Sequence, residues 1–156
     1  MNYNIHPIFV HFPVALLMTY AVAKIVPLKK WFPRIEWRQI EIALLSVGFV
    51  GGWLAMVTGE SAEHLARPSH AIVEMHQMLG SISMFIFGAL LAGEILKSLN
   101  FLMPLANVLT NPFLSKVLAF AGLISITLTG LLGGVMTYGP NVDPLAPFVL
   151  KLLGLQ

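Results

Sequence analysis

Four long runs of apolar residues follow one another along the 156-residue chain, separated by segments that carry charge or proline. The runs cover about 7–26, 39–58, 73–96 and 113–137. An α-helix needs about 20 residues to cross a hydrocarbon core of ~30 Å, and each run has that length. Because a chain in lipid must satisfy its own backbone hydrogen bonds, such runs favour helices. The pattern therefore predicts an all-α integral membrane protein, a four-helix bundle.

Composition supports lipid as the main solvent of this chain. Hydrophobic residues make up 57% of it and charged residues 10%, whereas about a quarter of a soluble domain is charged. We find no internal repeat and no linker, so residues 1–156 are expected to form a single domain. The absence of cysteine excludes disulfides, thiolate metal sites and covalent c-type haem. A net charge of +2 is too small to suggest nucleic-acid binding.

The distribution of lysine and arginine predicts the orientation. Most of these residues flank the first and third connectors: Lys24, Lys29, Lys30, Arg34, Arg38, Lys97 and Lys116. Only Arg67 and Lys151 lie on the other side. An excess of basic residues marks the cytoplasmic face, so we expect both termini outside the cytoplasm and the chain in a bacterial inner membrane. The segment 139–156 is too short to span, and we expect a re-entrant or interfacial piece anchored by Phe148 and Lys151.

All five histidines lie at or near the extracytoplasmic end of the predicted bundle: His6, His11, His64, His70 and His76. An imidazole is costly in hydrocarbon and usually has a function there. His11 and His76 each lie about one turn inside a different span, so we expect them at similar depth. That placement suits two axial ligands of one b-type haem. His6 and His70 offer a second haem or metal, and His64 is expected to be a solvated loop residue.

Other residues near this end offer further contacts to a cofactor. Arg67 is a candidate partner for haem propionates, or else a solvated loop charge. Three acids flank the second connector, namely Glu60, Glu63 and Glu74. Together with His6, His11, His70 and His76 they are alternative ligands for non-haem iron, copper or zinc. Four glycines either allow close helix packing or leave room for a flat macrocycle: Gly51, Gly52, Gly133 and Gly134.

Several motifs resemble those of a bacterial membrane family, domain of unknown function 2231. The opening HPIFVHFPVALL at 6–17 is similar to the family signature HPxxVHFPxAL. The resemblance continues through TGESAEH at 58–64, HAIVEMHQMLG at 70–80 and GGVMTYGPNVD at 133–143. It differs where the family often has a histidine after the last tyrosine, because Gly139 follows Tyr138 here.

This resemblance implies a four-helix protein of the inner membrane. By position, His6, His11 and His76 match family histidines, and His70 matches those of a subgroup. Some members are fused to Rieske or cytochrome c domains, which implies electron transfer and a b-type haem.

Three functions follow from these observations. The first is a cytochrome b-like electron-transfer protein, an oxidoreductase subunit with one or two haem b groups near the periplasmic face. Its partners would be membrane lipid and a quinone, a periplasmic cytochrome or a Rieske-type carrier. The second is a non-haem metal protein for transport or oxidation. The third is an accessory subunit of a respiratory complex whose histidines only join helices. A four-helix unit of this size also often forms a homo-oligomer.

Overall fold

The computed structural model describes the backbone of residues 6–66, 69–141 and 143–155, and the side chains of residues 10–59, 69–141 and 143–155. Within these residues every regular element is an α-helix, which confirms the predicted all-α class. The helices are α1 (His6–Ile25), α2 (Leu28–Trp31), α3 (Trp37–Ala66), α4 (His70–Ser98), α5 (Met103–Leu109), α6 (Pro112–Tyr138) and α7 (Ala146–Leu152).

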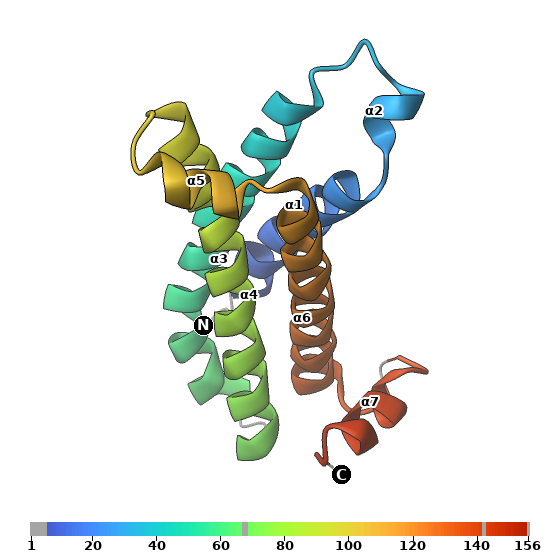
Figure 1. Ribbon diagram of the computed structural model, residues 1–156. Helices are drawn as coiled ribbons and strands as arrows, with labels where there is room; N and C mark the ends of the chain where they lie inside the picture. Colours follow the sequence, from blue (N-terminus) through green and yellow to red (C-terminus); the bar gives the residue numbers. More distant parts are fainter. Residues whose placement is uncertain (1–5, 67–68, 142, 156) are drawn as a thin grey trace.

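The four long helices pack around one centre. Helix α1 contacts α3 and α6, and α4 contacts the same two helices, so α1 and α4 lie diagonally opposite. Helices α4 and α6 run side by side, whereas α1 crosses them obliquely (Figure 1). The short helices α2 and α5 lie at one end of this bundle and α7 at the other (Figure 1).

Three helices within the described residues are long and apolar enough to cross a membrane. They comprise Trp37–Gly59, His70–Ser98 and Pro112–Tyr138, while Val10–Ile25 is a shorter apolar helix. Large apolar side chains point outward from them: Phe85 is 80% exposed and Phe113 is 79% exposed. Water-soluble monomers rarely expose contiguous apolar surface on this scale, so these faces are suited to lipid.

Helix α3 is longer than the apolar pattern predicted. The segment 59–66, expected to be a polar loop, continues the helix as far as Ala66. Its glutamates, alanines and leucine are good helix formers, and their polarity marks the end of the apolar run rather than the end of the helix. The third connector also contains an unexpected helix, α5, with a proline in its first turn.

The core lies where the four long helices meet. Its buried residues are Leu17, Tyr20, Ala21, Leu45, Phe87, Leu90, Ala119 and Ile126. Tyr20 of α1 meets Phe87 of α4 edge-on, with ring centroids 6.1 Å apart. Gly122 lets α6 approach this pair, because a Cβ there would lie 2.9 Å from the Phe87 ring. A second cluster joins α6 to α7 at the opposite end from α5.

Candidate functional site

The side chain of His76 lies between α4 and α6. Its Nδ1 atom is 2.9 Å from the carbonyl oxygen of Thr129 on α6. The ring packs on Gly133, one turn further along α6, where a Cβ would lie 3.4 Å from His76 Cε1. The missing side chain at Gly133 therefore provides the space that a half-buried imidazole occupies in this helix interface.

The contact with Thr129 determines which ring nitrogen of His76 carries the proton. A carbonyl oxygen only accepts hydrogen bonds, so Nδ1 donates. In the neutral ring the lone pair then resides on Nε2, the atom that can bind a metal. Metal-ligating histidines are commonly held in this way by a backbone carbonyl. The same bond also joins two helices, so both sequence-based interpretations of His76 remain consistent with its geometry.

His11 lies on the surface of α1, with an exposed side chain. Two residues later, Pro13 is buried against α3, where a Cβ on Gly51 would lie 3.1 Å from the proline ring. Proline at this position packs against a glycine and leaves α1 helical from His6 to Ile25. This contact sets the level of His11 relative to α3.

The same stretch of α3 also sets the level of His11 relative to α4. A Cβ on Gly52 would lie 2.6 Å from the sulfur of Met84. Met84 follows His76 by eight residues, which is about 12 Å along a helix. His11 precedes Pro13 by two residues, about 3 Å of helix, in the direction of the end that carries His76. The expectation that His11 and His76 lie at similar depth stays a prediction.

Two glycines that were candidates for a macrocycle pocket serve helix packing instead. Gly51 is covered by Pro13, and Gly52 is covered by Met84 and Leu17. Gly133 differs from them, because the nearest side chain to it is the imidazole of His76. Of these three glycines, Gly133 alone adjoins a candidate ligand.

His70 and Glu74 form a surface pair at the start of α4. His70 Nδ1 is 3.5 Å from Glu74 Oε1, and their side chains are 83% and 68% exposed. Among the residues that the structure describes, no three histidine or acidic side chains gather closely enough to hold a metal ion. Other predicted site residues have side chains outside the described residues, namely His6, Glu60, Glu63 and Arg67, and the same is true of His64.

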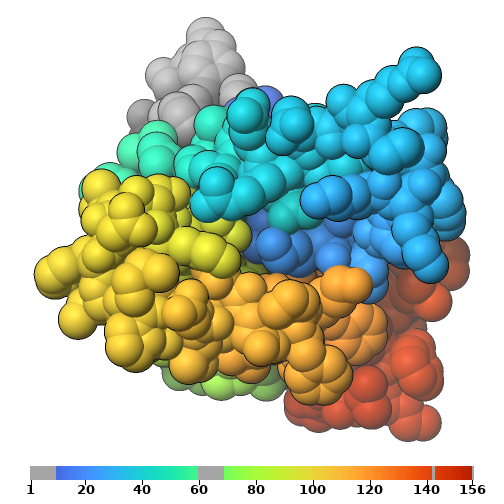
Figure 2. Space-filling model, turned by 45° about the horizontal axis from the view of Figure 1, so that its top comes forward, coloured from blue at the N-terminus to red at the C-terminus, as the bar shows by residue number. Residues whose placement is uncertain are grey.

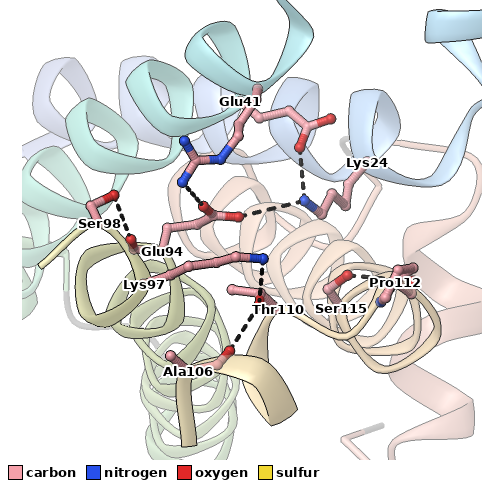
Figure 3. A network of polar contacts seen from close by, with 10 residues as sticks. Lys24, Glu41, Glu94, Lys97, Ser98, Ala106, Thr110, Pro112 and Ser115 are labelled. Carbon is pink, nitrogen blue, oxygen red and sulfur yellow. Dashed lines mark hydrogen bonds and ion pairs between the residues drawn. The ribbon is translucent and has the colours of Figure 1, made fainter. Parts of the chain in front are cut away.

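Four charged side chains at the other end of the bundle form a cluster that sequence reasoning missed (Figure 3). Lys24 of α1 is 2.8 Å from Glu41 of α3 and 4.0 Å from Glu94 of α4. Arg38 of α3 is 3.0 Å from Glu94. We call these four residues the charge clamp. The sequence offered no signal of this pairing beyond the position of the four residues near the ends of the predicted spans.

The fold and its exposed apolar faces define an integral membrane protein made of helices. The family model described as "Predicted membrane protein (DUF2231)" matches residues 2–143. The chain belongs to this family, which confirms the resemblance seen in its motifs. No curated protein and no solved structure matches the chain.

Proposed function

We propose that the chain crosses a bacterial inner membrane four times, with both termini outside the cytoplasm. Helix α1 supplies the fourth span. The apolar segment Val10–Ile25 is only part of this helix, which begins at His6 and has 20 residues. The connectors that hold α2 and α5 lie at the same end of the bundle (Figure 1). They carry or adjoin most of the basic residues, and basic connectors face the cytoplasm. His70 and His76 then lie toward the periplasmic face.

Within this membrane frame, the chain is a b-type cytochrome-like electron-transfer protein. The observation that supports this function is the bond from His76 Nδ1 to the Thr129 carbonyl. It fixes the tautomer whose Nε2 would bind iron, and the packing on Gly133 holds the ring in a defined direction. A bound haem would exchange single electrons. The chain contributes the ligand, its orientation and a surrounding of low dielectric constant that tunes the reduction potential.

In this proposal a histidine of α1 would be the second ligand of the haem. His11 is the predicted ligand. Helix α1 begins at His6, which is five residues nearer the end where α4 starts. His6 is therefore the alternative to His11. The electron partner would be a quinone from the lipid, or a periplasmic cytochrome or Rieske-type carrier.

The test compares haem content in purified full-length variants at position 76. His76→Asn keeps an amide donor near the place of Nδ1 and so can retain the bond to Thr129, but it lacks Nε2. We expect His76→Ala and His76→Asn to lose most of the bound haem, because loss of a ligand weakens binding at least as much as the ~10–100-fold effect of losing a supporting residue. The reduced-minus-oxidised absorption spectrum and haem per chain report the result.

The thermal unfolding midpoint separates a ligand role from a structural one. If His76 only joins helices, His76→Asn should keep both the midpoint and the haem content. Full haem in His76→Asn, or a wild-type chain with no haem band, would refute the proposal. Metal analysis of that haem-free protein would then examine the non-haem alternative.

The second ligand is assigned by single variants on α1, with His70→Ala as the matched control. Either His11→Ala or His6→Ala should lose haem to the same extent as His76→Ala. His70→Ala should retain it, because that side chain is 83% exposed and paired with Glu74. Loss of half the haem in His70→Ala would instead show a second haem at that position.

A further inference from the structure

The connector between α1 and α3 projects from the end of the bundle. It comprises residues 27–36, includes α2, and is called the basic arm below. Figure 1 shows α2 well away from the other helices, and Figure 2 shows the blue-to-cyan segment extending past the outline of the bundle. No residue of α2 is buried. The arm thus adds little to the core, which raises the question of what it contacts.

The basic arm is nevertheless folded. The backbone N–H of Phe32 donates to the carbonyl of Leu28 over 2.8 Å. The indole N–H of Trp37, at the start of α3, donates to the carbonyl of Phe32 over 3.0 Å. The rings of Phe32 and Trp37 are in tilted contact, 6.4 Å between centroids. These contacts tie the arm to α3, so its backbone keeps a defined arrangement.

Three large apolar side chains of the arm are exposed. Trp31 is 62% exposed, Phe32 is 53% exposed and Ile35 is 39% exposed. The arm directly follows the apolar helix α1 and directly precedes the apolar helix α3. Aromatic side chains at the ends of membrane spans favour the headgroup level of the bilayer. The exposed rings therefore place the arm at the membrane surface.

Three cations of the arm lack an acidic partner. Lys29, Lys30 and Arg34 are exposed, and no carboxylate in the described part of the chain lies within ion-pair distance of them. The neighbouring cations of the charge clamp differ, since Lys24 and Arg38 are both paired with glutamates. Positive charge in this region is thus paired inside the bundle and left in excess on the arm, which holds three cations and one acid, Glu36.

We infer that the basic arm is a binding surface for the headgroups of anionic phospholipids. Its aromatic side chains insert at the interface, and its three cations meet lipid phosphates. Phosphate oxygens accept hydrogen bonds from ammonium and guanidinium groups, which are the donors that the arm presents. The arm presents exposed apolar side chains beside its cations. A lipid is favoured over an acidic protein because one lipid molecule offers an apolar part to the former and an anionic group to the latter.

The test measures which lipid surrounds Trp31. The full chain is placed in phosphatidylcholine vesicles that contain a minor fraction of phosphatidylglycerol, with one of the two lipids brominated to quench tryptophan. The contribution of Trp31 is the difference between the chain and its Trp31→Phe variant. We expect brominated phosphatidylglycerol to quench Trp31 well beyond its share of the vesicle, with the preference weakened by salt.

A variant set isolates the cations of the arm. The triple variant Lys29→Gln, Lys30→Gln, Arg34→Gln should lose the preference, at about fivefold per cation removed. The matched control is Lys97→Gln, Lys116→Gln, Lys151→Gln, which removes the same charge from exposed positions elsewhere. This control should retain the preference.

Three results would overturn the inference. Equal quenching of Trp31 by both lipids would show no selectivity, and quenching by neither would place the arm in water. Loss of the preference in the control triple variant would assign it to net charge rather than to the arm. Weaker quenching of Trp31 after addition of poly-glutamate, without a preference for either lipid, would assign the arm to an acidic protein.

Discussion

The two ends of α4 lie in different chemical surroundings. Near its start, His76 is held by a hydrogen bond to a backbone carbonyl and by contact with a glycine of α6. Near its end, Glu94 belongs to the charge clamp, whose members come from α1, α3 and α4. One end is thus joined by ionic contacts among three helices, while at the other the imidazole of His76 lies at the interface of α4 and α6.

This difference follows from the length and tilt of α1. Helix α1 has 20 residues, whereas α4 has 29. It is held at the charge clamp through Lys24 and crosses the bundle obliquely, so it does not accompany α4 to its start (Figure 1). The clamp end is thus held by ionic contacts that link α1 to α3 and α4.

The largest stability effect is expected at the charge clamp. Lys24→Leu leaves the part-buried Glu41 without its cation, which should destabilise the protein by about 2–3 kcal/mol, somewhat less than for a fully buried pair. The double variant Lys24→Leu, Glu41→Leu should recover most of this loss. Unfolding in detergent micelles supplies the free energies for a double-mutant cycle. A coupling energy near zero would show that the pair of Lys24 and Glu41 adds nothing to the free energy of unfolding.

An intermediate effect is expected midway between the two ends, where α6 approaches α4. A Cβ at Gly122 would lie 2.9 Å from the buried Phe87 ring, so Gly122→Ala should cost ~1–3 kcal/mol. Gly130 is the matched control, because nothing lies within 4 Å of a Cβ there. Gly130→Ala should stabilise the helix by about 0.5–1 kcal/mol. Similar thermal unfolding midpoints for both variants would contradict this packing.

The smallest effect concerns the contact between α4 and α6 on the way to His76. Ser125 donates to the carbonyl of Leu79 on α4 over 2.9 Å. Ser125→Ala should cost ~0.6 kcal/mol, the average for such bonds between membrane helices. Thr127 bonds only within α6 among its described contacts, to Leu123, so Thr127→Val should be close to neutral. If the two variants unfold alike, the bond between the helices adds nothing measurable.

Much of the secondary structure could be predicted from the sequence. The apolar runs at 73–96 and 113–137 lie inside α4 and α6, because an uninterrupted apolar run of this length is stable only as a helix in lipid. The end of α3 was predicted less well. Polarity at 59–66 was interpreted as a loop, although those residue types are good helix formers.

The candidate site was predictable only in part. The importance of His76 followed from its residue type and its place inside a span, and its contact with α6 agrees with that. Its partner Thr129 could not be predicted, since the accepting atom is a backbone carbonyl that every residue carries. The charge clamp was also missed, because pairing between Lys24 and Glu94 depends on the approach of helices distant in sequence.

The sequence by itself determined that this protein is helical, that lipid covers it and that its histidines need an explanation, because hydrophobicity and residue type act locally along the chain. Only the tertiary structure decided which side chains meet. Levels along a bundle depend on the tilt of each helix, and tilt results from packing contacts such as that of Pro13 on Gly51. For that physical reason, the contact of His76 with Thr129 and Gly133 could be seen only in the folded chain.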